Sequence, residues 1–219
     1  MSIFVPASIP IRTDEHLGRV ENWKGGQGHA WAVRNPVTVE ALDKNYAERF
    51  GVTRTQVNCE MLVGVPRDAT VLEVGCSAGA QLNAMEAAGF SNLFGCDLSA
   101  DAVKMCRWPA IVADGTQLPF EDASVDLVMT SGTLMQIPPH QKERFVGELR
   151  RVARRWIYGV EMWTEHETVW DFGDLMPPAW TLDWPNWLPR FGWPITRADW
   201  LRYRSPTAPP LYAYVLERP

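Results

Sequence analysis

The alternation of two kinds of segment between residues 70 and 162 constrains the fold more than any other feature of the sequence. Short apolar runs rich in β-branched residues alternate there with segments whose apolar residues recur at helical spacing. Strands that alternate with helices form a largely parallel sheet with helices on both faces. The sequence therefore predicts an α/β protein. The expected strands cover residues 70–75, 93–96, 110–113, 125–130, 156–162 and 211–217.

The expected helices have recognisable capping residues. Gly51 is a natural C-cap for the helical segment 38–50. Thr53 and Gln56 have the spacing of a capping box at the start of the next helix. Ser99 is the expected N-cap of a third. The expected helices cover residues 38–50, 53–64, 80–88, 99–106 and 139–152.

Charge and composition limit the partners of the chain. Its 219 residues carry a formal net charge of −5, so no overall positive field attracts nucleic acid or an anionic membrane. We interpret the basic run at Arg150, Arg151, Arg154 and Arg155 as a solvated helix end. No apolar run approaches the ~18 residues of a membrane span, and no secretory signal pattern is present. The four cysteines lack metal-ligand spacing, as is usual for buried thiols in a reducing compartment. We expect a cytoplasmic protein that binds neither nucleic acid nor membranes.

The segment Val71–Gly79, with the sequence VLEVGCSAG, joins an expected buried strand to an expected helix through a turn of small residues. Glycine at Gly75 and Gly79 lets the backbone adopt positive φ and approach a ligand closely. The ligand then meets the N–H groups at the N-terminus of the helix. Doubly wound folds bind nucleotides in such crevices, at the carboxyl ends of parallel strands.

The next three strands each end in a polar or small residue at the same edge of the sheet. Asp97 ends the second strand, 22 residues after Gly75, where an acid accepts hydrogen bonds from ribose hydroxyls. Asp114 ends the third strand, where an acid can contact the exocyclic amine of an adenine. Ser131 ends the fourth strand. The strand ends together predict a nucleotide-binding site.

These residues resemble the class I S-adenosylmethionine methyltransferase family. The family signature of an acid followed by G-x-G/S-x-G corresponds to residues 73–79, and its D-x-x-x-L-P-F segment corresponds to residues 114–120. The match departs from the family at Cys76, where glycine is frequent. The resemblance covers about residues 65–165. It implies a Rossmann-like class I methyltransferase fold with a mostly parallel seven-stranded sheet and helices on both faces.

The resemblance implies S-adenosylmethionine as the cofactor, with S-adenosylhomocysteine as its product. The turn at residues 75–79 then flanks the methionine part, Asp97 holds the ribose and Asp114 holds the adenine. Ser131 and Leu134 line the sulfonium end. A dinucleotide oxidoreductase is the nearest alternative, but its spacing G-x-G-x-x-G is absent from the turn. The implied cofactor-binding residues of this segment are Glu73, Gly75, Cys76, Gly79, Asp97, Leu98, Asp114, Gly115, Ser131 and Leu134.

The otherwise irregular lead-in at residues 1–35 carries a second resemblance. Residues 23–35 are similar to the W-x-G-x-x-G-x-x-[YW]-x-x-R-N opening of methylases associated with pseudaminic acid and other bacterial surface-sugar pathways. That likeness implies a lid over the cofactor, in which Arg34 pairs with the methionine carboxylate and Trp31 closes the site against water. The alternative is that the tryptophans pack the lead-in onto the core.

Tryptophan and proline are concentrated toward the end of the chain. Eight of the eleven tryptophans lie from Trp156 onward, and nine of the seventeen prolines lie beyond Asp174. We expect an N-terminal lid with helices at residues 1–64 and a Rossmann-like methyltransferase core at 65–219, with an insertion at about 163–205. The insertion is expected to shape the acceptor pocket; alternatively, its tryptophans fill the core or a dimer interface. Monomer and homodimer both stay open.

Methyl transfer from a sulfonium requires alignment of donor and acceptor and sometimes removal of one proton. Glu161 and His166 are the favoured catalytic residues, because the end of the fifth strand flanks the transferred methyl group in this fold class. His29 and His140 are further base candidates. No metal site is expected, since Asp171, Asp174 and Asp183 have no distinctive ligand spacing.

The sequence thus predicts S-adenosylmethionine-dependent methyl transfer to a small-molecule acceptor, such as a sugar, a nucleotide sugar or another biosynthetic intermediate. Two alternatives stay open. One is a non-catalytic regulatory module that binds S-adenosylmethionine or S-adenosylhomocysteine, and the other is a protein methyltransferase. Turnover separates the enzymes from the module.

Overall fold

A seven-stranded sheet organises the chain in a computed structural model, which describes residues 5–6, 21–35, 37–171, 179–204 and 208–219. The strand order is β4-β3-β2-β5-β6-β10-β9, and β10 is antiparallel to both of its neighbours while the other pairs are parallel. This confirms the predicted mostly parallel, Rossmann-like sheet. The strands are β2 (Thr70–Val74), β3 (Asn92–Asp97), β4 (Ala110–Val112), β5 (Val125–Ser131), β6 (Ala153–Met162), β9 (Ile195–Leu201) and β10 (Leu211–Glu217).

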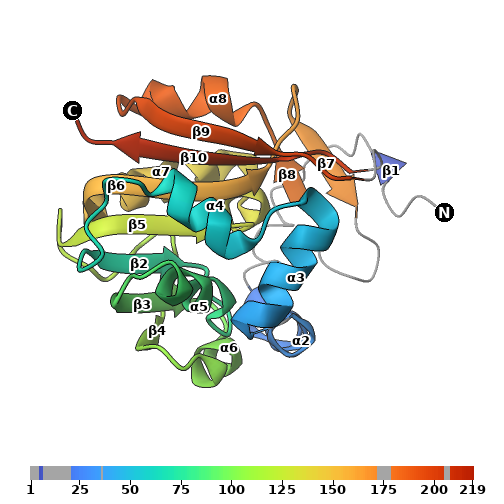
Figure 1. Cartoon of the computed structure of the whole chain (residues 1–219), viewed down its shortest axis with the longest axis vertical. Helices are drawn as coiled ribbons and strands as arrows, with labels where there is room; N and C mark the ends of the chain where they lie inside the picture. The colour runs from blue at the N-terminus through green and yellow to red at the C-terminus, as the bar shows by residue number, and fades with distance from the viewer. Residues whose placement is uncertain (1–4, 7–20, 36, 172–178, 205–207) are drawn as a thin grey trace.

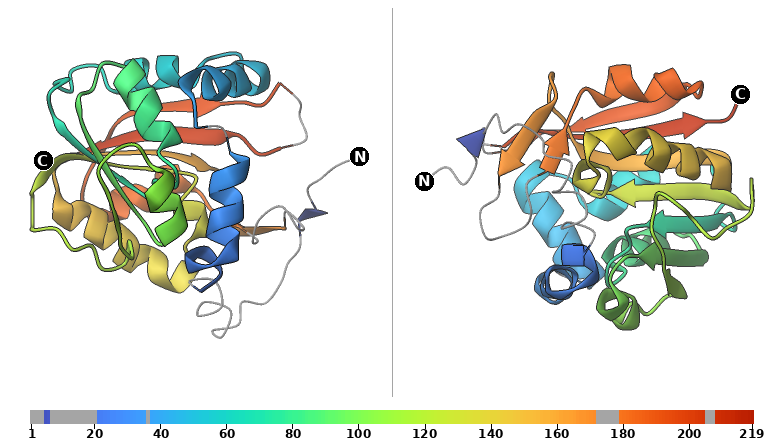
Figure 2. Two further views of the ribbon diagram at one scale, coloured as in Figure 1. Left: turned by 90° about the horizontal axis from the view of Figure 1, so that it is seen from below. Right: turned by 180° about the vertical axis from the view of Figure 1, so that it is seen from behind.

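Helices cover both faces of this sheet (Figures 1 and 2). One face carries α3 (Val39–Phe50), α4 (Arg54–Met61) and α5 (Ala80–Ala87), and the opposite face carries α7 (Pro139–Val152) and α8 (Trp184–Trp187). Successive residues of β2 point to opposite faces of the sheet and need cover on both. Val71 packs into the core on the first face, and Leu72 packs into the core on the second. A strand that is buried on both sides reads as a continuous apolar run.

Two more helices lie near the carboxyl ends of the parallel strands. Helix α6 (Ala100–Met105) follows β3, and α2 (Gly26–Arg34) lies beside it (Figure 1). Residues 26–34 were expected to be mostly irregular, so α2 corrects that expectation. Its C-cap, Asn35, donates backbone and side-chain hydrogen bonds to the Trp31 carbonyl. The glycines that weaken its helix propensity also permit its close packing.

The predicted capping residues are confirmed. Gly51 is in the left-handed region at φ +83°, and Thr53 forms the full capping box with Gln56. The Ser99 side chain accepts a hydrogen bond from the Ala102 amide. Helix α4 ends at Met61, earlier than predicted.

A second, antiparallel sheet lies at the carboxyl end of the main sheet (Figure 1). It contains β1 (Val5–Pro6), β7 (Thr168–Asp171) and β8 (Ala179–Thr181), in the order β1-β7-β8. Trp180 of β8 is buried, as are Trp184 and Trp193 farther along the chain, and the Trp184 indole donates to the Met162 carbonyl at 2.7 Å. These three tryptophans therefore serve the packing of the domain, which is the alternative that the sequence left open.

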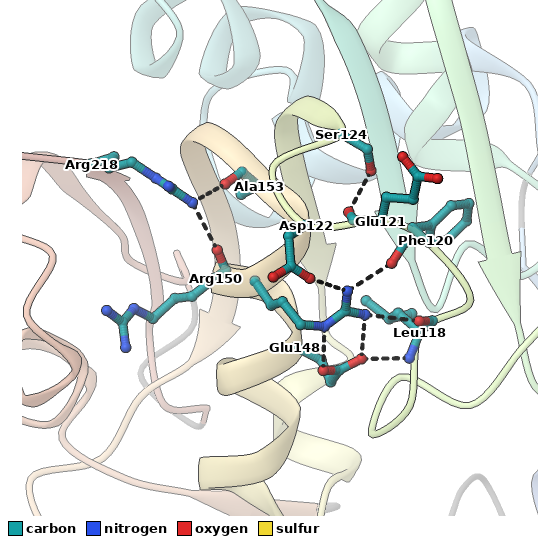
Figure 3. Close-up of polar contacts among 10 residues, drawn as sticks. Leu118, Phe120, Glu121, Asp122, Ser124, Glu148, Arg150, Ala153 and Arg218 are labelled. Carbon is teal, nitrogen blue, oxygen red and sulfur yellow. Dashed lines mark hydrogen bonds and ion pairs between the residues drawn. The ribbon is translucent and has the colours of Figure 1, made fainter.

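The basic run at the end of α7 binds loops instead of facing solvent alone. Figure 3 shows Leu118, Phe120, Asp122 and Glu148 gathered around one guanidinium group, which belongs to Arg151. Glu148 also accepts a hydrogen bond from the Leu118 amide at 2.7 Å. This network ties the loop before β5 to α7. It therefore fixes the loop that begins with Asp114, the acid at the end of the third parallel strand.

Candidate cofactor site

A cavity opens where β2, β3 and β5 end, beneath α2. Its walls come from four strand-end loops, from α2 and from Trp23, which precedes α2. A smaller cavity adjoins it and shares the wall residues Trp31, Gly75, Ser77 and Ser131. The site therefore lies at the sheet edge where the sequence predicted it.

The turn after β2 is shaped by positive φ values at Gly75 (+81°), Ser77 (+47°) and Gly79 (+85°). A Cβ on Gly75 would overlap the Thr133 side chain, and one on Gly79 would lie 2.6 Å from Cys106 Sγ. Glycine is therefore required at both ends of the turn, by conformation and by space. The turn presents backbone, not side chains, to the cavity.

Asp97 braces this turn from the end of β3. One carboxylate oxygen accepts a hydrogen bond from the Ser77 amide and the other from the Ser99 amide, each at 2.8 Å. Burial raises the pKa of Asp97, and these hydrogen bonds oppose the shift. Each carboxylate oxygen has a second lone pair, so Asp97 can also accept hydrogen bonds from a ligand's hydroxyls.

Asp114 and Gly115 line the next part of the wall. One Asp114 oxygen accepts hydrogen bonds from the Thr116 amide and hydroxyl at 2.8 Å, which fixes the turn. A Cβ on Gly115 would overlap the Phe145 ring of α7. The aromatic ring thus packs directly against the backbone of this loop.

Gly28 and Trp31 of α2, and Trp23 just before it, line another part of the cavity. A Cβ on Gly28 would lie 2.7 Å from Ser99 Cβ, so α2 sits directly on the start of α6. The two tryptophan rings meet edge to face at 6.1 Å. They give the cavity an aromatic roof.

Glu73 carries an orphaned polar atom in the wall of the smaller cavity. The residue is 1% exposed, and its Oε2 has no hydrogen-bond partner among the described residues. Burial raises the pKa of Glu73 well above its usual range, although the Arg54 guanidinium opposes this. An ammonium group bound in the smaller cavity would satisfy this oxygen. The methionine end of S-adenosylmethionine carries such a group, so the residues present fit this cofactor.

Comparison with known proteins agrees with this geometry. Residues 72–156 match the family model described as a methyltransferase domain. A curated relative, an uncharacterized protein of Haemophilus influenzae, is 30% identical over 139 residues, which are 52% of this chain and 53% of the relative. The chain thus spans about half the length of the curated relative that it matches.

Solved methyltransferases share the fold. The 1,6-didemethyltoxoflavin-N1-methyltransferase of Burkholderia thailandensis, with bound 1,6-didemethyltoxoflavin and S-adenosylhomocysteine, is similar at TM-score 0.69 and 12% identity over 98% of this chain and 94% of that one. Magnesium protoporphyrin IX methyltransferase of Synechocystis, with bound S-adenosylhomocysteine, is similar at TM-score 0.65 and 16% identity, over 94% of this chain and 100% of that one. A chain from a complex with the Haloferax volcanii Trm112 methyltransferase activator is similar at TM-score 0.65 and 20% identity, over 88% of this chain and 96% of that one. The domain has the class I fold of S-adenosylmethionine-dependent methyltransferases.

The fold brings most of the predicted cofactor residues together. Trp31, Gly75, Asp97, Leu98, Asp114, Gly115 and Ser131 line the main cavity, and Glu73 and Cys76 line the smaller one. Three others lie behind the walls or outside them. Gly79 supports the turn from beneath, Leu134 is buried in the core, and Arg34 is exposed with its guanidinium 5.2 Å from the centre of the Trp31 ring.

The predicted catalytic residues lie away from the cavity walls that the structure describes. Glu161 is fully buried and accepts four hydrogen bonds, so it is enclosed by protein. His166 is exposed in the turn between β6 and β7, and its carbonyl accepts hydrogen bonds from Thr164 and Thr168. His29, another base candidate, has its Nδ1 3.6 Å from Asp101 Oδ2. Asp174, one of the acids considered as a metal ligand, lies outside the described residues.

The sequence did not single out the loop after β5 and the start of α7 as a whole. Thr133, Met135, Gln136, Ile137 and Gln141 all line the cavity. They follow Ser131 directly, and the proline pair before α7 marks the end of their loop. Proximity to a strand end was the available signal for them. Nothing in their residue types indicates a nucleotide site.

Proposed function

We propose that this protein transfers the methyl group of S-adenosylmethionine to a small-molecule acceptor. The observation that carries the proposal is the convergence of Asp97, Asp114 and the positive-φ turn after β2 on one cavity. Two acids and an open backbone suit the ribose, the adenine amine and the methionine end of that cofactor. S-adenosylmethionine supplies an activated methyl group on a sulfonium; the chain binds, orients and encloses it.

The aromatic roof suggests the shape of the acceptor. Trp31 of α2 and Trp23, which precedes α2, line the cavity, and a flat heterocycle or a sugar ring can stack on such faces. We therefore propose an acceptor of this shape. The likeness of residues 23–35 to surface-sugar methylases keeps sugars and nucleotide sugars among the candidates.

The titratable groups on the wall bear on the acceptor atom. Of the described residues that line the main cavity, only Asp97 and Asp114 have ionisable side chains, and we assign both to the cofactor. A sugar hydroxyl needs a base to lose its proton, whereas a ring nitrogen or a carboxylate has a lone pair available at neutral pH. We therefore rank heterocycles with a ring nitrogen and carboxylic acids above sugars.

A release assay for S-adenosylhomocysteine tests this proposal. The protein is incubated with S-adenosylmethionine and panels of heterocycles, carboxylic acids, sugars and nucleotide sugars. We expect product above the acceptor-free blank with at least one heterocycle or acid, and much less product with Asp97→Ala. Binding of the cofactor without product across every panel would contradict the enzyme and favour the cofactor-binding regulatory module.

A further inference from the structure

The loop after β5, residues 132–138, joins three parts of the cofactor site. It contains the 3-10 helix η1 (Leu134–Gln136). Thr133 packs against Gly75 of the cofactor turn. Met135 lies in one small apolar cluster with Trp31 of α2. Displacement of this loop would therefore move the cavity wall against both the turn and α2.

A buried carboxylate holds the first end of η1. Glu161 Oε1 accepts hydrogen bonds from the Thr133 amide at 3.3 Å and the Leu134 amide at 3.2 Å, and Oε2 accepts one from the Met135 amide at 3.3 Å. The Thr130 hydroxyl donates to Oε1 at 3.0 Å. The amides at the start of a helix have no partner inside it. Glu161 supplies that partner to three in succession.

A buried ammonium holds the other end. Lys142 is 1% exposed, and its Nζ donates hydrogen bonds to the Leu134 carbonyl at 3.2 Å and to the Ile137 carbonyl. The same Nζ lies 5.7 Å from the ring centres of both Trp180 and Trp184. An anion at the start and a cation at the end both complement the dipole of the helical turn.

Burial of two charges is costly unless hydrogen bonds compensate for lost hydration. Apolar side chains could fill the same volume without that cost. They could not satisfy three amides and two carbonyls of an irregular loop, however. The need to satisfy these amides and carbonyls therefore explains why the two charged side chains are buried beside the loop.

We propose that Glu161 and Lys142 are positioning residues that hold loop 132–138 in its cofactor-binding shape, and that Glu161 does so in its ionised form. The expected effect of this loop on cofactor binding rests on the proposed function. Glu161 thereby acts through the loop and touches neither cofactor nor acceptor.

The proton state of Glu161 controls the loop because a carboxylate accepts from all four donors, whereas a protonated carboxyl must donate one hydrogen. Burial raises the pKa of Glu161 to about 7, while its four hydrogen bonds oppose the rise. The titratable groups near it are Tyr212 and Tyr214 of β10, with Lys142 at the far end of the loop. Burial raises the pKa of both tyrosines, so neither titrates near neutrality.

Amide NMR shifts test the link between Glu161 and the loop without any cofactor. We expect the amide signals of residues 133–135 to titrate with a midpoint near pH 7 in the wild type, and to lose this titration in Glu161→Gln. In Thr130→Val the midpoint should rise, because one donor to the ionised form is gone. His140→Gln, which removes the exposed imidazole in the first turn of α7, and Glu217→Gln, at an exposed ion pair with Arg155, should leave the midpoint unchanged.

Binding of S-adenosylhomocysteine, measured by calorimetry from pH 5.5 to 8.5, tests the consequence for the site. We expect wild-type affinity to weaken as the pH falls through about 7, by up to about tenfold per pH unit for one proton. Glu161→Gln should bind about tenfold more weakly at pH 8, and its affinity should lose the part of the pH dependence whose midpoint is near 7.

Loop amides that do not titrate, or that titrate equally in Glu161→Gln, would overturn the inference. So would pH-independent binding that Glu161→Gln leaves unchanged. Titrating amides with no binding by the folded wild type at any pH would instead overturn the proposed function while the positioning role stands. The shift of midpoint in Thr130→Val keeps the test valid if Glu161→Gln does not fold.

Discussion

Gly75 meets two separate requirements that both exclude a side chain. Its φ is +81°, and a Cβ would overlap Thr133. We expect Gly75→Ala to lower the free energy of unfolding by about 1–3 kcal/mol and to weaken binding of S-adenosylhomocysteine. Thermal denaturation and calorimetry measure the two effects.

Gly147 provides the control for Gly75, because it lies inside α7 and a Cβ there meets no atom within 4 Å. Gly147→Ala should leave binding intact and stabilise the protein by up to about 1 kcal/mol, since alanine favours the helix. Equal behaviour of the two variants would show that the turn after β2 is not under the constraint described.

Glu161 also makes stability depend on pH in a predictable direction. Its pKa in the folded protein, about 7, lies above the ordinary value of 4.5. The stabilisation due to its protonated form is therefore complete below about pH 4.5 and is lost as the pH rises through 7. Relative to Glu161→Gln, the wild type should lose on the order of 3 kcal/mol of unfolding free energy between these limits.

Urea denaturation of both proteins across this pH range measures that difference. The stability of the fold and the affinity for the cofactor are then expected to change in opposite directions with pH. If the free energy of unfolding changes with pH in the same way in the wild type and in Glu161→Gln, the raised pKa of Glu161 is contradicted.

At the scale of elements, α2 depends on one close contact. A Cβ on Gly28 would overlap the Trp23 carbonyl and lie 2.7 Å from Ser99 Cβ, whereas a Cβ on Gly26 meets nothing within 4 Å. We expect Gly28→Ala to push α2 away from α6 and to weaken binding of S-adenosylhomocysteine about tenfold, a loss of the size of one or two contacts. Gly26→Ala should bind like the wild type.

The two glycine variants in α2 need only a calorimetric titration each and a melting temperature. Both melting temperatures should stay close to the wild type, because the described residues of α2 contribute Ala32 and Trp31 to two small hydrophobic clusters and nothing to the two large ones. Equal affinities in the two variants would show that α2 does not act as a lid.

Elements with strong local signals were predictable from the sequence, and those without them were not. Gly51, Thr53 and Ser99 mark helix ends by backbone chemistry that tertiary packing leaves intact. Strand β9 was missed because it lies at the sheet edge with most of its side chains exposed or half-buried. Its place depends on pairing with β10, which is a long-range contact.

At the scale of the whole molecule, the order of the strands gathers the site. Parallel neighbours β3, β2 and β5 bring Asp97, Gly75 and Ser131 to one edge, although they are far apart in the sequence. The sequence predicted these wall residues because each follows a strand directly. It could not predict that Glu161 faces a loop from inside, because that depends on how β5, β6 and η1 pack. In the part of the chain that the structure describes, no helix has the length and apolarity to span a bilayer.

The central claim is that the cavity at the carboxyl ends of β2, β3 and β5 binds S-adenosylmethionine. Calorimetric titration with S-adenosylmethionine and S-adenosylhomocysteine tests it most directly, on the wild type, Asp97→Ala and the control Asp199→Ala, whose acid is exposed on β9. We predict micromolar binding that Asp97→Ala weakens by ~1–3 kcal/mol, the cost of unpaired ribose hydroxyls, and that Asp199→Ala leaves unchanged. Absence of binding by the folded wild type, or equal loss in both variants, would contradict the account.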